Sequence, residues 1–136
     1  MKVPHNAHIA IVDGENFIVM RNKGQIFEPE LGDVQKPDLE ATNYSAGVSH
    51  QDHIGQRKGT STQLDELAHS AAAAEWLNAK CIAGEIENLI VIADPKTLGE
   101  MRRHYHGETE KRIVGDLAKT MTNESGDRIA KALADA

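Results

Sequence analysis

The run of residues from Asn88 to Ala93, NLIVIA, followed directly by Asp94-Pro95, constrains the fold more than any other feature of this sequence. The run has no alternation of polar and apolar residues, which is typical of a central strand buried on both faces of a sheet. Asp94 has a favoured N-cap side chain, and Pro95 suits the first position of a helix. The segment therefore predicts a buried strand that leads at once into a helix, which is the repeating unit of an α/β fold.

The N-terminal part predicts an antiparallel meander. Residues Ala7–Val12 form a short apolar run that Asp13-Gly14 closes, and this dipeptide is a strong hairpin signal. Residues Phe17–Arg21 follow at hairpin distance, and Gln25–Phe27 are expected to return as a third strand after a second turn.

Residues 28–59 have neither helical nor strand periodicity, apart from a short strand expected near 39–44. Loops of this length are uncommon in compact domains and often serve a function. A long helix is expected from Thr60, where Thr60 and Gln63 fit a capping box, to about Ile82, with Gly84 ending it.

One face of this expected helix is apolar at the helical period; its residues are Leu64, Leu67, Ala68, Ala71, Ala74, Cys81 and Ile82. Trp76 lies about 150° from the centre of that face, at about 100° per residue. We therefore expect either that the long loop covers Trp76 or that Trp76 anchors a protein partner or a second copy of the chain.

Residues Lys111–Leu117 predict a fifth strand, and Ser125–Ala134 predict a closing helix with Ile129 and Leu133 four residues apart. The expected order is β-β-β-α-β-α-β-α, which is the ribonuclease-H-like order. It predicts a mixed five-stranded sheet with helices on both faces.

Composition predicts one domain, residues 1–136, because 136 residues with 40% apolar content suffice for one core. The net charge of −6 argues against a general nucleic-acid binder. Cys81 is the only cysteine, and Asp13 and Glu15 interrupt the N-terminal apolar run. We therefore expect a reduced, cytoplasmic protein without a membrane span.

The stretches NLIVIADPKTLGEMRRHY and KRIVGDLAKTMTN resemble the host-attachment protein family of small bacterial proteins. The residues that match the family pattern are Pro95, Leu98, Gly99, Met101, Arg102, Lys119, Met121 and Thr122. Thr120 stands where that family usually has aspartate. The resemblance implies a domain similar to the middle domain of the eukaryotic and archaeal class-one peptide release factors. It also implies a cytoplasmic adaptor, with the ribosome or tRNA as partner and an indirect role in host-cell attachment.

In those release factors a Gly-Gly-Gln loop precedes the long helix and acts on the ester of peptidyl-tRNA. Here Gly55-Gln56 precede the helix, but Ile54 replaces the first glycine. A β-branched residue does not readily adopt the left-handed backbone angles open to glycine. Because no catalytic motif is complete, we expect a protein without enzymatic activity.

Cations and hydroxyls near the start of the long helix form a candidate anion or RNA site, since a helix N-terminus favours negative charge. Its residues are Gln56, Arg57, Lys58 and Thr60, and Arg102 and Arg103 extend it from the one dense basic stretch. The alternative is a solvated polar loop with an ordinary cap, and cations that stabilise a helix C-terminus.

Four acidic residues raise the alternative of a ribonuclease-H-like nuclease, in which carboxylates hold two Mg²⁺ or Mn²⁺ ions. They are Asp13, Asp94, Glu66 and Asp127. Asp13 also suits a turn and Asp94 a helix cap, so both have a structural explanation.

Three histidine pairs have spacings that suggest metal ligands: His50 and His53, His5 and His8, and His104 and His106. Zinc sites need three or four converging ligands, which these pairs do not supply. We therefore expect solvated histidines, no metal and no cofactor.

Overall fold

The computed structural model describes residues 1–39 and 58–136, with side chains through residue 39 and from Asp65 onward. Its centre is a five-stranded sheet in the order β3-β2-β1-β4-β5. The strands are β1 (His8–Val12), β2 (Phe17–Asn22), β3 (Leu31–Gln35), β4 (Leu89–Ala93) and β5 (Ile113–Ala118).

The sheet is mixed, as predicted. β1 is antiparallel to β2, with Val12 opposite Phe17, and parallel to β4, with Val12 opposite Ala93. β5 continues the sheet parallel to β4, and β3 pairs with β2 in antiparallel fashion. Every residue of β4 is buried, which confirms the central strand predicted from its continuous apolar run.

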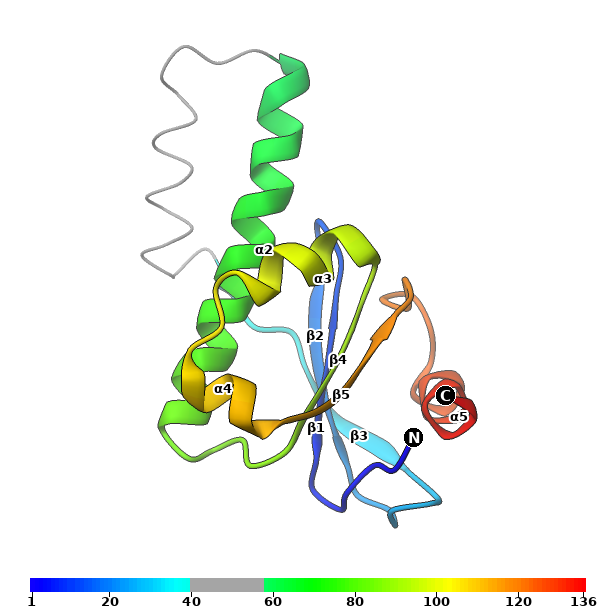
Figure 1. Ribbon diagram of the computed structural model, residues 1–136. Helices are drawn as coiled ribbons and strands as arrows, with labels where there is room; N and C mark the ends of the chain where they lie inside the picture. The colour runs from blue at the N-terminus through cyan, green and yellow to red at the C-terminus, as the bar shows by residue number, and fades with distance from the viewer. Residues whose placement is uncertain (40–57) are drawn as a thin grey trace.

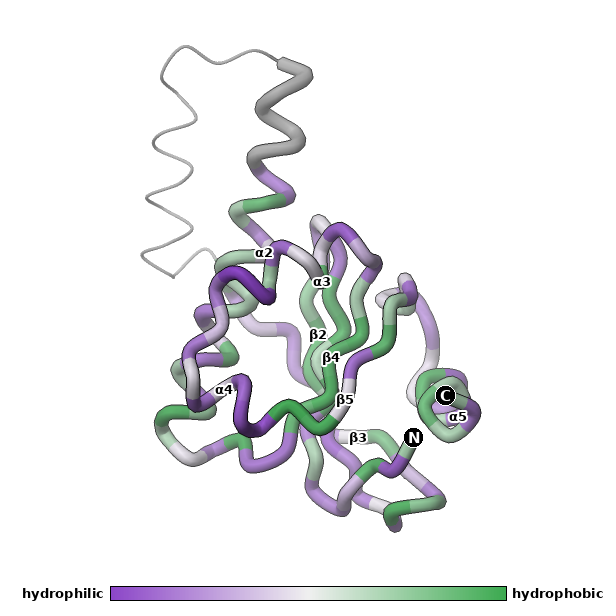
Figure 2. Tube along the Cα trace, in the orientation of Figure 1, coloured by the Kyte–Doolittle hydropathy of each residue, from purple (hydrophilic) through white to green (hydrophobic). Residues whose placement is uncertain are grey.

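Helices cover both faces of the sheet (Figure 1). α2 (Lys58–Ile82) and α3 (Pro95–Arg102) pack on one face, with the short α4 (Gly107–Arg112) beside α2, and α5 (Gly126–Asp135) packs on the other. The side chains of β1 alternate between the two cores: Ala10 and Val12 face α2, while Ile9 and Ile11 face α5. Figure 2 shows the same arrangement as a hydrophobic sheet with more hydrophilic connections around it.

Small residues bring α2 close to the sheet. Ala71–Ala74 and Leu77 are buried in the core between α2 and the sheet, and Gly84, with φ +80°, follows the end of the helix as predicted. Ile82 is 57% exposed, so its predicted place on the buried face is wrong. As the last residue of α2, it extends beyond the core.

Trp76 contacts the core despite its angular position on α2. It is half-buried, its ring meets that of Phe17 edge to face at 5.4 Å, and Lys80 Nζ lies 5.2 Å from the ring centre. The angular position alone was therefore misleading, because the large indole ring reaches Phe17 at the start of β2 from the flank of the helix. The loop that was expected to cover Trp76 lies largely outside the described residues.

The third strand differs from the prediction. Gln25–Phe27 lie in a tight turn, in which the backbone N–H groups of Gln25 and Glu28 each donate to the carbonyl of the other residue. The strand is instead Leu31–Gln35, within the predicted loop. The short strand predicted near 39–44 falls almost wholly outside the described residues.

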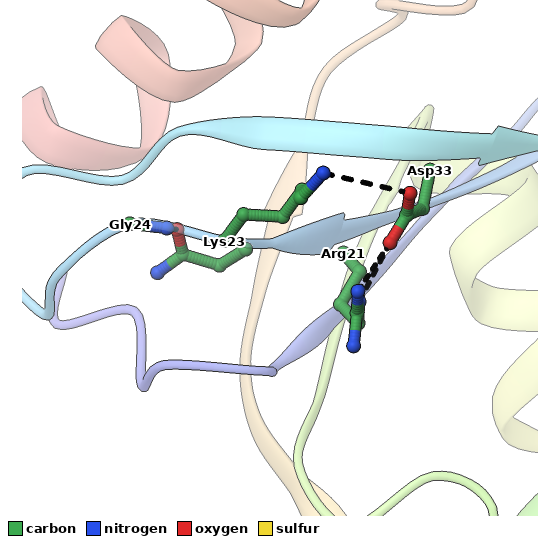
Figure 3. A network of polar contacts seen from close by, with 5 residues as sticks. Arg21, Lys23, Gly24 and Asp33 are labelled. Carbon is green, nitrogen blue, oxygen red and sulfur yellow. Dashed lines mark hydrogen bonds and ion pairs between the residues drawn. The ribbon is translucent and has the colours of Figure 1, made fainter.

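A polar network holds β3 against β2 at a bulge (Figure 3). Asp33, with φ +52°, accepts hydrogen bonds from Arg21, and Lys23 Nζ lies 3.8 Å from Asp33 Oδ1. The hydrogen bond from Arg21 and the charge of Lys23 lower the pKa of Asp33. Because these groups are exposed, the network orients the strand more than it stabilises the fold.

The remaining boundaries lie close to the predicted ones. Asp94 caps α3, with Oδ2 accepting from the Thr97 N–H at 3.1 Å, and Ser125 caps α5. α2 begins two residues earlier than predicted, at Lys58. β5 begins at Ile113 because the two preceding residues complete α4, a helix that was not predicted. Among the described residues, no helix has the length and apolar character that a membrane crossing requires.

Replacing Tyr105 by phenylalanine is expected to leave stability unchanged or to raise it by about 1 kcal/mol. The ring packs against the core, and its hydroxyl is buried without a hydrogen-bond partner among the described residues. Burial also raises the pKa of Tyr105. Urea unfolding measures the effect, with Tyr105→Leu as the control that loses ring packing. A loss above 1 kcal/mol in Tyr105→Phe would reveal a partner for the hydroxyl.

Candidate functional site

The carboxyl ends of β1 and β4 bring two of the candidate acids to one edge of the sheet. Val12 and Ala93 are register partners, and Asp13 and Asp94 follow them directly. In open α/β sheets, ligands commonly bind outside the carboxyl ends of the strands. The contacts of each acid decide whether this edge has the chemistry of a metal site.

The carboxylate of Asp13 is saturated with hydrogen bonds. Its Oδ1 accepts from the backbone N–H groups of Glu15 at 2.8 Å and Asn16 at 2.6 Å. Its Oδ2 accepts from the Thr122 hydroxyl at 2.5 Å. Burial alone raises the pKa of Asp13, but the hydrogen bonds from Thr122, Glu15 and Asn16 together lower it. Asp13 therefore ties the β1–β2 turn to the segment that follows β5.

Asp13→Asn is expected to cost about 1 to 2 kcal/mol of stability at pH 7, because a charged acceptor is lost. Since the pKa of Asp13 is lowered in the folded state, its contribution is present above the unfolded value of about 3.9. That contribution disappears as the pH falls through the lowered folded pKa. The stability difference between wild type and variant should therefore shrink in acid.

Urea unfolding at several pH values between about 2 and 7 measures this difference. Asp65→Asn, at an exposed position of α2, is the control and should follow wild type throughout. A difference between wild type and Asp13→Asn that is independent of pH would contradict the assignment.

The other three candidate acids do not join Asp13 in a metal site. Both oxygens of Asp94 accept bonds from Thr97, and Glu66 Oε2 lies 3.8 Å from Lys96 Nζ. Asp127 is exposed in the first turn of α5, on the other face of the sheet. Within residues 1–39 and the part of the chain described from 58 onward, no three His, Cys, Asp or Glu residues are placed to hold a metal ion. The nuclease hypothesis gains no support from this geometry.

Two cavities flank the β1–β2 turn at this edge. The larger, about 380 Å³, is lined by Glu15, Asn16, Phe17, Ile18, Lys36, Pro37, Asp38, Leu39, His69, Thr122 and Asn123. The smaller, about 200 Å³, is lined by Gly14, Glu66, Leu67, Ser70, Asp94, Lys96 and Thr97. Burial lowers the pKa of His69, and the Asp13 backbone and nearby carboxylates only partly oppose this shift. This edge of the sheet therefore has polar cavities, and its acidic residues are engaged in structural contacts.

The candidate anion site lies partly outside the described residues, which exclude Gln56 and Arg57. Lys58 and Thr60 belong to the first turn of α2, where only the backbone is described, so Thr60 lies inside the helix rather than at its cap.

The basic residues that follow Met101 form ion pairs with nearby acidic residues. Arg102 Nη2 lies 2.8 Å from Asp116 Oδ2, and Arg103 Nη1 lies 3.7 Å from Glu100 Oε1. The later basic residues have acidic neighbours as well: His104 Nε2 lies 2.8 Å from Glu100 Oε2, and both Lys111 and Arg112 pair with Glu108. The pairs of Arg102 and Lys111 are exposed and individually weak, whereas Glu100 and His104 are at most 20% exposed. Together the acidic partners reduce the local positive charge.

The histidine pairs have separate contacts. His5 Nδ1 lies 2.8 Å from the Gly24 carbonyl, and His8 is half-buried with a pKa that burial and the charge of Arg21 lower. His106 caps α4, with its Nδ1 accepting from the Glu108 N–H at 3.0 Å. His50 and His53 lie outside the described residues.

Sequence comparison adds one finding. The family model described as bacterial archaeo-eukaryotic release factor family 12 matches residues 6–133. Among curated proteins, none matches the chain. The family match confirms the predicted release-factor-like relationship, whereas it does not confirm the host-attachment name.

Proposed function

Because the chain belongs to bacterial archaeo-eukaryotic release factor family 12, we propose that it is a release-factor-like adaptor that associates with the ribosome or with tRNA. The observation that carries the proposal is the family match, which extends over residues 6–133 and so includes one core of the fold and, except for Met1 and Val3, the other. A role in host-cell attachment would then be an indirect consequence of an effect on translation.

The placement of α2 supports this proposal. The N-terminal part of the helix rises beyond the sheet (Figure 1), and we call residues 58–65 the arm. In the sequence, Gly55-Gln56 precede the arm with only Arg57 between them, as the Gly-Gly-Gln loop of the release factors precedes their long helix. A helix that extends beyond the sheet can present its first turn to a partner.

We place the function in binding rather than in hydrolysis. Ile54 occupies the position of the first glycine of the release-factor motif, and its β-branched side chain disfavours the backbone angles that glycine permits. Purified protein is therefore expected not to release the peptide from peptidyl-tRNA, and Gln56→Ala should not change that result.

The direct test is co-sedimentation with ribosomes and a tRNA mobility shift at moderate salt. Arg57→Ala/Lys58→Ala should weaken binding and flatten its salt dependence, because fewer phosphate contacts release fewer counterions. Arg128→Ala/Lys131→Ala is the matched control, since it removes the same charge from α5 on the opposite face. Wild-type protein that neither sediments with ribosomes nor shifts tRNA would refute the proposal.

Two secondary expectations follow from the contacts of the candidate residues. Arg102→Ala/Arg103→Ala should weaken ribosome or tRNA binding less than the Arg57/Lys58 variant, because both arginines already have acidic partners.

A dimer through the Trp76 face stays a prediction. Sedimentation equilibrium of wild type and Trp76→Ala would test it.

A further inference from the structure

A hollow surrounds His8 at the end of the sheet opposite to Asp13. His8 is the first residue of β1, and by the alternation of the strand its side chain lies on the α2 face, as those of Ala10 and Val12 do. Three cavities, of about 520, 210 and 140 Å³, share His8 and Glu85 in their linings. We call these three cavities together the His8 hollow.

The His8 ring has no hydrogen-bond partner among the described residues. Its Nδ1 is buried and unpaired, and no hydrogen bond joins its Nε2 to any of them. Burial and the charge of Arg21, its register partner on β2, lower the pKa of His8, so the imidazole is uncharged at neutral pH. Polar groups in protein interiors normally have a partner, and a molecule in the hollow can supply one for this half-buried ring.

Other side chains of the hollow also have free donors and acceptors. Gln35, the register partner of Val19, has a side-chain amide with no hydrogen bond to another described residue. Arg21 donates to Asp33 through Nε and Nη2 (Figure 3), which leaves its Nη1 available. The hollow therefore offers a carboxamide, an imidazole and a guanidinium nitrogen to one bound molecule.

The charges around the hollow favour an uncharged molecule. Arg21 and Lys80 lie on the same rim as three carboxylates, those of Asp33, Glu85 and Glu87. The carboxylates oppose an anion, and the arginine and lysine oppose a cation. A metal ion is no better suited, because no three His, Cys, Asp or Glu residues in the described part of the chain converge.

Apolar side chains complete the lining. Val19 and Val34 come from the sheet, whereas Trp76 and Ile86 come from α2 and the segment after it. Apolar walls with a few unpaired polar groups are the usual character of a small-molecule site. Unpaired nucleobases are recognised in this way, through apolar or aromatic contact with the ring and hydrogen bonds to its edge. A carboxamide can bond a base edge through both its oxygen and its nitrogen.

We propose that the His8 hollow binds a nucleobase, either of a free nucleoside or of an unpaired nucleotide in RNA. His8 Nε2 and the Gln35 amide bind the edge of the base, and the apolar residues contact its ring. The choice of a nucleobase over other uncharged heterocycles rests on the proposed function, because ribosomes and tRNA contain unpaired bases. Free nucleosides test the hollow without either partner.

The fluorescence of Trp76, the only tryptophan of the chain, reports occupation of the hollow. Uncharged nucleosides and short single-stranded RNA should quench it saturably, whereas duplex RNA, whose bases are paired, should not. Tighter binding of RNA than of nucleosides identifies an unpaired RNA base as the ligand, and equal binding identifies the free nucleoside. No saturable quenching below about 1 mM, or equal quenching by duplex RNA, would overturn the proposal.

Variants of the two polar residues identify the contacts. His8→Phe keeps a ring without its nitrogens, and Gln35→Ala removes the amide; each should weaken binding roughly three- to tenfold. The salt dependence of RNA binding should stay unchanged, because contacts with bases release no counterions. His5→Phe and Gln25→Ala, at exposed positions outside the hollow, are the matched controls. Affinities of the hollow variants equal to those of the controls would contradict the assignment.

Two further results separate this site from the proposed function. If His8→Phe does not fold, Gln35→Ala decides alone, because Gln35 is exposed on an edge strand. If wild type neither sediments with ribosomes nor shifts tRNA, the proposed function is wrong, while saturable quenching by nucleosides still supports the base site. If wild type binds ribosomes or tRNA but no nucleoside or single-stranded RNA quenches Trp76, the base site is wrong and the proposed function stands.

Discussion

Asn22→Leu is expected to destabilise the protein by about 3 kcal/mol or more. The side chain of Asn22 is fully buried at the end of β2, and both its amide nitrogen and its amide oxygen form hydrogen bonds. Its Nδ2 donates to the carbonyls of Val3 at 3.0 Å and Pro4 at 3.2 Å, and its Oδ1 accepts from the N–H groups of Gly24 at 2.8 Å and Glu30 at 2.9 Å. Leucine would leave these backbone groups without their partner, and buried backbone groups without partners are costly.

Urea unfolding of Asn22→Leu measures the loss, with Asn123→Ala at an exposed position as the control, expected within about 0.5 kcal/mol of wild type. The loss should be accompanied by faster hydrogen exchange at the Gly24 and Glu30 amides. A variant as stable as wild type would mean that water replaces the Asn22 side chain, and it would contradict the role assigned here.

Asn78→Leu is expected to cost about 2 to 3 kcal/mol for the same reason at another place in the fold. Asn78 is buried on α2, and its side chain forms hydrogen bonds with the connection between α3 and α4 and with α4 itself. Its Nδ2 donates to the His104 carbonyl at 2.8 Å, while its Oδ1 accepts from the His106 N–H at 2.9 Å and the Thr109 hydroxyl at 2.6 Å. Leucine fills the space but supplies none of these bonds.

Hydrogen exchange separates this effect from a general loss of stability. The His106 amide should exchange faster in Asn78→Leu under conditions where the amides of β4 stay protected. Glu75→Leu, at an exposed position of the same helix, should leave both unchanged. Uniform acceleration across the sheet would instead indicate that Asn78 supports the whole fold.

The elements that the sequence predicted well have strong local signals. β4 is a continuous apolar run, α3 begins with an aspartate and a proline, and α5 has a serine cap and a regular apolar face. Each of these signals depends on residues within one or two turns of one another. The layers of the fold follow from them because connections between parallel strands have a fixed hand.

β3 and α4 were missed because their stability comes from distant partners. β3, LGDVQ, contains a glycine and the bulged Asp33, and only its pairing with β2 and the contact with Arg21 make it a strand. α4, GETEKR, is hydrophilic and short, and its buried Thr109 is held by Asn78 of α2. No local periodicity marks either segment.

The candidate site shows the same limit. The sequence places Asp13 in a turn, which the structure confirms, but the hydroxyl of Thr122 that completes its contacts comes from 109 residues away. Gly14 was expected to shape that turn, but its φ is not positive, and a methyl group there would meet the side chain of Glu66 from α2. Spacing along a chain predicts the conformation of a residue better than it predicts which distant side chain will meet it.

The position of β1 in the sheet has a consequence for synthesis of the protein. β1 can pair with β2 as soon as both have left the ribosome, but its parallel partner β4 follows about 80 residues later. At roughly 5 to 20 residues per second, that delay is about 4 to 16 s. During this time the apolar edge of β1 is open to pairing with other chains, so the nascent protein passes through an aggregation-prone interval that ends only when β4 arrives.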